Sequence, residues 1–242
     1  MKQCYICKRE FNSFTPYKHS YSDTYKSFQV IGSDLENYGC PVCGCNDRER
    51  HLFMYFDKLG FWNAFHGASV LHFAPELPLY KMLKRSNTIP SLYYPCDIEP
   101  DLFDFHVNWT DIYDIRLFGG NSFDFIIVNH VLEHINFVRA AIKEMARVLK
   151  PGGTIIAQTP FSRVLPVNFE LCDIETDELR TYFYGEPHHY LVYCYKYLIV
   201  DFVKYGFKFR VYRHDKYLSG TEKLSGVNPK EDLLTFEKRG DE

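Results

Sequence analysis

The sequence lacks any feature that would anchor the chain in a membrane or mark it for export. No apolar run within its 242 residues approaches the length that a membrane-spanning helix needs. Residues 1–4 lead into polar sequence rather than into an apolar signal segment. We therefore expect a cytoplasmic protein, and in a reducing compartment its eight cysteines are not expected to form disulfides.

Internal repeats, low-complexity tracts and a strong charge of one sign are missing as well. The formal net charge of -3 gives no general attraction to nucleic acid, so the sequence disfavours a nucleic-acid partner. What is present is a hydrophobic content of 46% and an aromatic content of 17%, which we attribute to core packing. This length and composition fit one sizeable α/β domain with a small appendage.

The cysteines are concentrated near the start of the chain, where two Cys-x-x-Cys pairs occur. Cys4 and Cys7 form the first pair, and Cys40 and Cys43 form the second. Each pair can present two thiolates to one ion from a tight turn, and two such turns complete a tetrahedral shell. The spacing predicts a structural zinc, because four thiolates leave no open position for catalysis. Cys45 either replaces one of these ligands or does not bind the metal. The alternatives to a zinc site for the two pairs are buried free thiols or a redox site.

The sequence between the cysteine pairs and just after them adds two expectations. Residues 11–38 are rich in Ser, Tyr and Lys and predict a loop or hairpin. A helix is predicted over residues 47–57, capped by Asn46 or by its own first residue. Arg48 and Arg50 lie at the start of this helix. We expect Arg50 to carry a solvated charge, while Arg48 is either solvated or part of a substrate pocket.

A strand–helix–strand unit is the clearest pattern in the rest of the chain. Phe123–Val128 is a short apolar run typical of a buried parallel strand. Residues 138–149 repeat apolar residues at helical spacing, and Pro-Gly-Gly at 151–153 ends that helix before a second strand at 154–157. Ligands of parallel sheets bind at the carboxyl ends of the strands, so residues 129–134 are candidates for a site.

Further elements are expected on both sides of this unit. The predicted strands are 68–74, 91–96, 206–213 and 233–238, and the predicted helices are 79–85 and 190–205. We expect residues 75–78 to form a turn, residues 173–180 a loop or lid, and residues 218–232 a polar loop. Asp97 follows the second strand, where a carboxylate can accept hydrogen bonds from both hydroxyls of a ribose. Asp111 could accept from an exocyclic amine of an adenine, and a simple turn acid is the alternative.

The order of elements over roughly residues 68–238 resembles that of class I S-adenosylmethionine-dependent methyltransferases. Two motifs carry the resemblance: Phe-Asp-Phe-Ile-Ile-Val-Asn-His-Val-Leu-Glu-His at 123–134, and Arg-Val-Leu-Lys-Pro-Gly-Gly at 147–153. The resemblance implies an α/β fold with a Rossmann-like, mostly parallel seven-stranded sheet whose last strand is reversed. We accordingly divide the chain into a small zinc-ribbon-like module at 1–50 and a methyltransferase domain at 51–242.

More narrowly, the chain resembles a bacterial subgroup that carries a Cys-Pro-x-Cys-Gly knuckle and nearby arginines ahead of the domain. This subgroup has a His-Phe-Ala-Pro-Glu first loop and a Gly-x-Pro-x-His turn, which match residues 72–76 and 185–189. The match places His189 on the histidine of the subgroup. The resemblance implies that S-adenosylmethionine is bound by His72, Phe73, Ala74, Glu76, Asp97, Ile98, Asp111, Ile112, Asn129 and His130.

The first loop departs from the broad family, which usually has Gly-x-Gly-x-Gly at this point. Glycine lets a backbone approach the cofactor closely, and this loop has none of those glycines. Ala74 is small enough to take the same place, and Glu76 could pair with the ammonium of the methionyl group. The alternative is a loop that has lost its affinity for the cofactor. The chain would then be a non-catalytic, zinc-bearing binding protein on a degenerate methyltransferase fold.

Methyl transfer from a sulfonium requires positioning and, for some acceptors, a base. His130, His134 and His189 are candidate bases because imidazole titrates near neutrality. We assign catalysis to His130, which is nearest the strand end, and to His189. We expect His134 to be a hydrogen-bonded packing residue, and Asn129 to bind the cofactor or the acceptor.

Two other activities are disfavoured because their motifs are missing. A nicotinamide-dependent Rossmann enzyme would need a Gly-x-Gly-x-x-Gly loop and a Tyr-x-x-x-Lys pair, but Tyr193 is followed four residues later by Tyr197. A nucleic-acid methyltransferase would carry an Asn/Asp-Pro-Pro-Tyr-type loop after the fourth strand. Analogy at the level of the fold favours a small-molecule or sugar acceptor, while the sequence leaves its identity and the oligomeric state open.

Overall fold

The computed structural model describes residues 1–85 and 87–240. The strands are β1 (Lys2–Gln3), β2 (Glu10–Phe11), β3 (Ser69–Phe73), β4 (Leu92–Asp97), β5 (Asn108–Trp109), β6 (Phe123–Val128), β7 (Leu149–Ile156), β8 (Phe161–Ser162), β9 (Tyr193–Cys194), β10 (Phe207–Tyr212) and β11 (Leu233–Lys238). The α-helices are α1 (Asp23–Ser27), α2 (Asp47–Leu59), α3 (Phe61–Phe65), α4 (Leu77–Leu83), α5 (Val138–Val148), α6 (Asp177–Tyr184), α7 (Tyr195–Lys204), α8 (His214–Tyr217) and α9 (Glu222–Ser225). Short 3-10 turns occur at η1 (Leu35–Asn37), η2 (Pro100–Leu102) and η3 (Leu132–His134).

A seven-stranded sheet with the order β10-β11-β7-β6-β3-β4-β5 forms the centre of the molecule. The strands from β5 to β7 in this order pair in parallel, whereas β11 is antiparallel to both β7 and β10. The predicted mostly parallel sheet with a reversed last strand is therefore confirmed. The strand order reverses between β3 and β6, and ligands of such sheets bind outside the carboxyl ends of the strands at this point.

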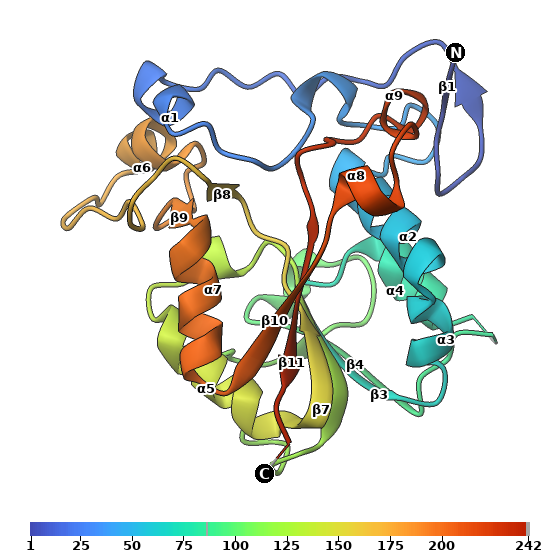
Figure 1. Ribbon diagram of the computed structural model, residues 1–242, viewed down its shortest axis with the longest axis vertical. Helices are drawn as coiled ribbons and strands as arrows, with labels where there is room; N and C mark the ends of the chain where they lie inside the picture. Colours follow the sequence, from blue (N-terminus) through green and yellow to red (C-terminus); the bar gives the residue numbers. More distant parts are fainter. Residues whose placement is uncertain (86, 241–242) are drawn as a thin grey trace.

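Helices cover both faces of the sheet (Figure 1), with α5 and α7 on one face and α2, α3 and α4 on the other. Successive residues of a strand point to opposite faces. Accordingly, Val70 packs in the core under α2 and α4, while the next residue, Leu71, packs in the core under α5 and α7. In the same way, Ile127 packs in the core under α2 and α4, and Ile126 packs in the core under α5 and α7. Burial on both faces explains why these strands are continuous apolar runs in the sequence.

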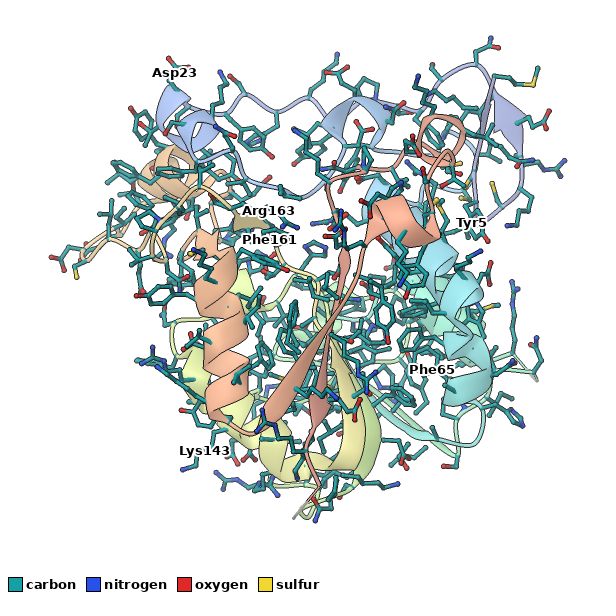
Figure 2. All side chains as sticks on the ribbon, viewed as in Figure 1. Tyr5, Asp23, Phe65, Lys143, Phe161 and Arg163 are labelled. Carbon is teal, nitrogen blue, oxygen red and sulfur yellow. The ribbon has the colours of Figure 1, made fainter. Side chains whose placement is uncertain are left out.

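Aromatic side chains fill much of these two cores, as expected from the composition. Most of the largest fully buried side chains are Phe or Tyr. Figure 2 shows Phe65 of α3 packed toward the sheet, whereas Lys143 of α5 lies on the outer surface. No helix among the described residues is both long enough and apolar enough to cross a bilayer.

Several predicted boundaries are wrong for identifiable reasons. Residues 151–153 lie inside β7, where Phe123 pairs with Leu149 but Phe125 pairs with Thr154, so the Pro-Gly-Gly turn is a bulge in the strand. Residues 173–180 are only partly a loop, because the side chain of Thr176 caps α6.

Other segments also contain more regular structure than expected. The predicted 190–205 helix begins only at Tyr195, since β9 precedes it and pairs with β8. The polar loop at 218–232 contains α9, and Pro78 belongs to the first turn of α4 rather than to the turn before it. Residues 11–38 hold α1 and η1 and run across the carboxyl end of the sheet (Figure 1).

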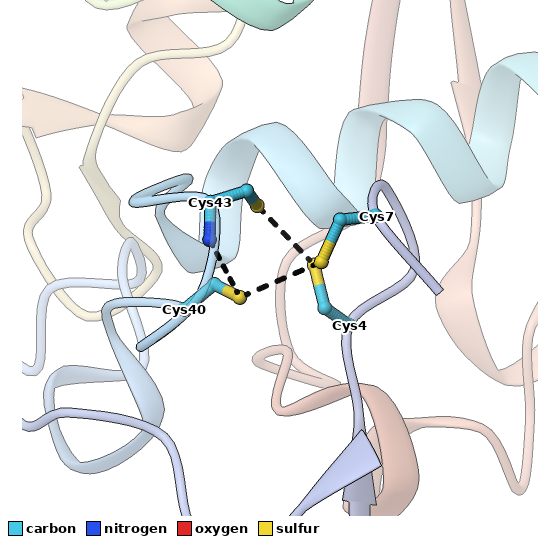
Figure 3. A group of neighbouring side chains, drawn as sticks. All are labelled: Cys4, Cys7, Cys40 and Cys43. Atoms are coloured by element: carbon cyan, nitrogen blue, oxygen red, sulfur yellow. Dashed lines mark hydrogen bonds between the residues drawn. The ribbon is translucent and has the colours of Figure 1, made fainter. Parts of the chain in front are cut away.

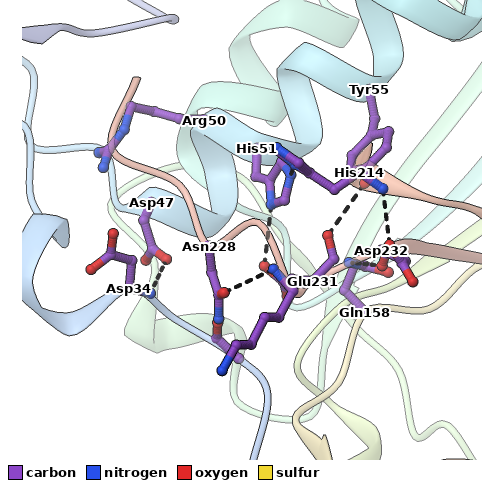
Figure 4. A network of polar contacts seen from close by, with 12 residues as sticks. Asp34, Asp47, Arg50, His51, Tyr55, Gln158, His214, Asn228, Glu231 and Asp232 are labelled. Carbon is purple, nitrogen blue, oxygen red and sulfur yellow. Dashed lines mark hydrogen bonds and ion pairs between the residues drawn. The ribbon is translucent and has the colours of Figure 1, made fainter. Parts of the chain in front are cut away.

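Arg50 is fully buried, so the expectation of a solvated charge is wrong. Its guanidinium donates hydrogen bonds to the carbonyl oxygens of Cys45 (3.0 Å), Tyr38 (3.1 Å), Asn37 (2.5 Å), Ser225 (2.9 Å) and Gly226 (2.8 Å). Because these carbonyls belong to the N-terminal segment and to the end of α9 with the residue after it, Arg50 joins both segments to α2. Figure 4 shows Arg50 at the start of this helix.

A second polar network binds the connection between β10 and β11 to α2 (Figure 4). His51 Nε2 lies 2.8 Å from His214 Nδ1, and His51 Nδ1 lies 3.4 Å from a carboxylate oxygen of Glu231. The hydroxyl of Tyr55 donates to the carbonyl oxygen of Glu231 at 3.2 Å. These groups are buried, and their hydrogen bonds to one another offset the cost of removing them from water.

Candidate active site and metal centre

Two strand ends at the switch point of the sheet carry residues in the left-handed backbone region. Ala74 follows β3 with a φ of 45°, and His130 follows β6 with a φ of 54°. The amide of Ala74 donates to the carbonyl oxygen of Cys96 at 2.9 Å, and the amide of His130 donates to that of Gln158 at 2.6 Å. Such conformations cost about 1–3 kcal/mol in L residues and cluster at functional sites. Ala74 thus adopts the conformation that favours glycine in a loop that has none.

Glu76 connects the ends of β3 and β6. One of its oxygens lies 2.8 Å from Nε2 of the buried His72, and the other accepts a hydrogen bond from Asn129 Nδ2 at 3.2 Å. Burial acts to raise the pKa of Glu76, but the hydrogen bond and charge of His72 hold this pKa below its ordinary value. The loop therefore presents an ionised carboxylate at the switch point.

The other residues of the expected cofactor site lie on the neighbouring strand ends. Asp97 ends β4, and one of its oxygens accepts from the amide of Glu99 at 2.8 Å. Asp111 follows β5 and accepts from the amide of Tyr113 at 2.8 Å. Ile98 is 52% exposed, whereas Phe73 and Ile112 are buried in the core.

A pocket of about 370 Å³ opens beside these strand ends. The residues between the cysteine pairs form one wall, and the turn at 185–189 contributes to another. Polar and aromatic lining residues include Tyr17, Tyr21, Tyr25, Tyr38, Arg48, His130, Glu133, His134, Glu186, His188 and His189. Arg48 and His130 also border a small cavity of about 10 Å³ next to Glu76 and Asn129, so they lie between the pocket and the strand ends. The structure thus places Arg48 in the pocket wall.

His130 is oriented by a buried carboxylate. Glu133, which is 1% exposed, accepts a hydrogen bond from Thr159 Oγ1 at 2.7 Å and lies 3.3 Å from His130 Nδ1. Burial acts to raise the pKa of Glu133, but the hydrogen bond and charge of His130 and the charges of nearby histidines hold it well below its ordinary value. An ionised carboxylate only accepts hydrogen bonds, so His130 Nδ1 is the donor, and in a neutral ring the lone pair is then on Nε2. This Nε2 is buried and has no hydrogen-bond partner in the described part of the chain.

His134 and His189 lie beside Glu133, with their rings edge to face at a centroid distance of 4.7 Å. His134 Nδ1 donates to the carbonyl oxygen of His188 at 3.1 Å, as expected for a hydrogen-bonded residue, but His134 also lines the pocket. His189 Nδ1 donates to the carbonyl oxygen of Tyr184 at 3.2 Å. Burial lowers the pKa of His189 to about 4, so its ring is neutral near pH 7. One ligand atom from each of Glu133, His134 and His189 lies within 4.8 Å of the others.

The four predicted zinc ligands meet in one cluster (Figure 3). The sulfur atoms of Cys4 and Cys43 are 3.8 Å apart, and those of Cys7 and Cys40 are 3.9 Å apart. A tetrahedral zinc with Zn–S bonds of about 2.3 Å separates its sulfurs by about 3.8 Å. The amides of Val42 and Cys43 also point at the sulfur of Cys40, at 3.4 and 3.5 Å. The donor set and its spacing therefore fit a zinc ion.

Cys45 lies against the same cluster. Its buried sulfur is 3.4 Å from those of Cys4 and Cys43. A fifth thiol at this distance can take the place of one of the four ligands.

The tyrosines of the pocket were not predicted from the sequence. Tyr17, Tyr21, Tyr25 and Tyr38 all lie between the two cysteine pairs, where the composition indicated only a loop or hairpin. Four tyrosines in one short segment indicate that the segment presents an aromatic surface. Where that surface points depends on how the segment packs against the sheet, and the sequence alone does not show this.

Comparison with known proteins agrees with this architecture. Residues 93–157 match the family described as methyltransferase domain. Among solved structures, the chain is similar to an S-adenosylmethionine-dependent methyltransferase from Archaeoglobus fulgidus, with a TM-score of 0.55, 13% identity, and coverage of 80% of this chain and 95% of that one. A methyltransferase from Mesorhizobium loti gives a TM-score of 0.52, 10% identity, and coverage of 76% and 98%. These structural likenesses show the fold.

Two curated relatives match a shorter stretch. The chain is 44% identical over 50 residues to the demethylmenaquinone methyltransferase of Corynebacterium glutamicum (strain R), which is 21% of this chain and 22% of that protein. The corresponding protein of Corynebacterium efficiens is 42% identical over the same length. The chain spans about a fifth of the length of the curated relatives it matches. Together with the fold, the domain match confirms the resemblance to S-adenosylmethionine-dependent methyltransferases and supports an enzyme of that kind.

Proposed function

We propose that the chain transfers a methyl group from S-adenosylmethionine to a small-molecule or sugar acceptor bound in the tyrosine-lined pocket. The observation that carries the proposal is the position of His130. This residue follows a central strand, in a left-handed conformation, and borders both the pocket and the small cavity beside Glu76. An acceptor in the pocket and a methyl donor at the strand ends would therefore meet beside its free nitrogen.

The residues at the strand ends fit the polar groups of the cofactor. Asp97 would accept hydrogen bonds from the ribose hydroxyls, because a carboxylate can accept from both at once. Asp111 would face the adenine, and Glu76 would bind the ammonium group, with Asn129 and His72 holding its carboxylate in place. The left-handed Ala74 would allow the backbone to approach the cofactor, which supports retained binding over a degenerate loop.

The bound cofactor would supply an activated methyl group on a sulfonium leaving group. The protein would then mainly orient the acceptor and remove its proton where needed. His130 is the residue suited to this task, because Glu133 holds its Nδ1 proton and leaves Nε2 as a proton acceptor. His189 also lines this pocket and would contribute to catalysis from beside Glu133.

The N-terminal module at 1–50 would have a structural role. A zinc ion on Cys4, Cys7, Cys40 and Cys43 would hold the two ends of the tyrosine-bearing segment together. Since Arg50 joins this segment to α2, the metal would stabilise one wall of the pocket rather than take part in chemistry.

Calorimetric titration with S-adenosylmethionine tests the proposal directly. We expect binding by the wild-type chain, and a loss of roughly 10- to 100-fold in affinity for Asp97→Asn, since a hydrogen bond to a charged group contributes about 1.5–3 kcal/mol. Asp101→Asn, an exposed acid in the following turn, is the matched control and should bind like the wild type. No binding at millimolar cofactor would reject the methyltransferase function and favour the non-catalytic binding protein.

A second measurement addresses the base. With labelled S-adenosylmethionine and a panel of phenols and nucleotide sugars, His130→Asn should lower methyl transfer by about 10²- to 10⁴-fold. Asparagine tolerates the left-handed backbone better than most residues, so the fold should survive this change. Unchanged transfer by this variant would exclude His130 as the base.

A further inference from the structure

We propose that Glu133, His134 and His189 bind a divalent transition metal in the wall of the tyrosine-lined pocket, and that this ion holds a hydroxyl oxygen of the acceptor. The metal site stands on the geometry of the three side chains, while its role in methyl transfer rests on the function proposed above. One ligand atom from each residue lies within 4.8 Å of the other two. Two imidazoles and one carboxylate form a donor set used by catalytic zinc sites.

Both histidines make their hydrogen bonds to carbonyl oxygens through Nδ1. A carbonyl oxygen can only accept, so Nδ1 of His134, 3.1 Å from the carbonyl of His188, must carry the proton. The same holds for Nδ1 of His189, 3.2 Å from the carbonyl of Tyr184. With Nδ1 as the donor, Nε2 is the nitrogen through which each ring would bind a metal. Histidines that bind metals usually donate their other ring proton in this way, which fixes the tautomer and the ring orientation.

The two parts of the site are tied together before any metal binds. Glu133 and His134 belong to η3, the next element after β6, whereas His189 comes from the turn after α6. The amide of Tyr190 donates to the carbonyl oxygen of Glu133 at 2.9 Å, which holds this turn against η3. Glu133 is further fixed by Thr159. The ligands are therefore preorganised across more than fifty residues of sequence.

Three protein ligands leave at least one coordination position open, and all three residues line the pocket. This position distinguishes the site from the four-cysteine cluster, whose shell is complete. A metal bound here would lower the pKa of a coordinated hydroxyl. Tyr17, Tyr21, Tyr25 and Tyr38 in the pocket lining would pack against the rest of an acceptor with an aromatic or sugar ring.

The proposed step conserves atoms and charge. The metal-bound acceptor hydroxyl gives its proton to His130 Nε2. The resulting oxygen anion attacks the methyl carbon, a new C–O bond forms, and the C–S bond breaks with its electron pair remaining on sulfur. The products are the methyl ether, S-adenosylhomocysteine and a protonated His130, and the metal does not change its oxidation state.

Cobalt(II) is a suitable probe because thiolate and imidazole–carboxylate sites give different visible spectra. The full chain, with its zinc in place, would be titrated with Co²⁺ in the absence of S-adenosylmethionine. We expect uptake of about one additional cobalt per chain, with weak d–d bands that shift when azide occupies the open position. A four-thiolate site has no such position and would not respond to azide.

His134→Ala and His189→Ala should each weaken this cobalt binding at least 10-fold. His188→Ala is the matched control, because it removes an exposed neighbouring imidazole but keeps the carbonyl that His134 uses. Thermal melts of each variant show whether the fold is intact, and His134→Gln replaces His134→Ala if the latter unfolds. Equal cobalt binding by the wild type and the folded His134 variant, or no uptake by the wild type, would overturn the metal site.

The cofactor titration is done on the same preparations, so the two proposals fail separately. Cobalt binding without S-adenosylmethionine binding would keep the metal site and reject the methyltransferase function. Cofactor binding without cobalt uptake would keep the methyltransferase function and reject the metal site. Glu133, His134 and His189 would then be a hydrogen-bonded wall of the pocket.

Discussion

Arg50 and Gly226 are separated by 176 positions in the sequence, and the guanidinium of Arg50 donates a hydrogen bond of 2.8 Å to the carbonyl oxygen of Gly226. The same guanidinium lies 3.9 Å from the centre of the Phe14 ring. Gly226 has a φ of 60°, and a Cβ at this position would approach the Phe14 ring to 2.5 Å. The tyrosine-bearing N-terminal segment, helix α2 and the chain after α9 therefore meet around one buried arginine.

Arg50→Lys should lower the free energy of unfolding by about 2–4 kcal/mol. Lysine keeps the charge but cannot reproduce the planar fork, so several buried carbonyl oxygens would lose their donor. Urea denaturation monitored by circular dichroism measures this change. Arg116→Lys, on an exposed arginine, should stay within about 0.5 kcal/mol of the wild type. Similar stabilities for the two variants would contradict the role given to Arg50.

Gly185→Ala should be more destabilising than Gly206→Ala. Both glycines have a φ of 87°, so both substitutions carry the same backbone penalty. At Gly185 the new methyl group would also lie 2.6 Å from the ring of Tyr25, whereas at Gly206 nothing lies within 4 Å. We expect an additional cost of about 1–3 kcal/mol at Gly185 from this overpacking. Equal changes in melting temperature would show that Tyr25 moves away freely.

Glu49→Gln should change the pH dependence of stability. Burial raises the pKa of Glu49 from 4.5 to about 7, even though the amide of Asn46 donates to its side chain. The unfolded chain therefore releases this proton at lower pH than the folded chain does. The stability contributed by Glu49 is fully present below pH 4.5 and is lost as the pH rises to about 7.

Glutamine keeps the capping box but cannot ionise. Relative to the wild type, Glu49→Gln should gain about 1–2 kcal/mol between pH 5 and pH 8, a figure reduced for the partial exposure of the side chain. Denaturation curves at several pH values measure this difference, with the exposed Glu36→Gln as control. A difference that does not vary with pH would contradict the raised pKa.

Cysteine variants should identify the four ligands of the N-terminal metal. If zinc binds Cys4, Cys7, Cys40 and Cys43, then Cys40→Ser should lower the zinc content toward zero and destabilise the chain, whereas Cys45→Ser should retain about one zinc. Metal analysis by mass spectrometry measures both, and Cys172→Ser, on an exposed and distant cysteine, is the control. Loss of zinc in Cys45→Ser with retention in Cys43→Ser would assign the fourth position to Cys45.

The elements that were predicted well are those whose pattern is local. The expected strand at 233–238 coincides with β11, and the helix at 138–149 differs from α5 by one residue. In both elements, the spacing of the apolar residues indicates which face of the strand or helix is buried. The start of α7 was predicted wrongly because β9, which precedes it, forms by pairing with the distant β8. The local sequence at residues 190–194 does not indicate this pairing.

The sequence by itself determined the order of buried strands and amphipathic helices, the two cysteine pairs, and the polar residues at the strand ends, because burial and periodicity are properties of neighbouring residues. Only the tertiary structure decided which polar groups meet. It buried Arg50 among carbonyl oxygens from two distant segments, brought His189 to Glu133 and His134, and turned four tyrosines toward one pocket. These contacts join residues far apart in the chain, and they depend on how the elements pack rather than on any pattern within one of them.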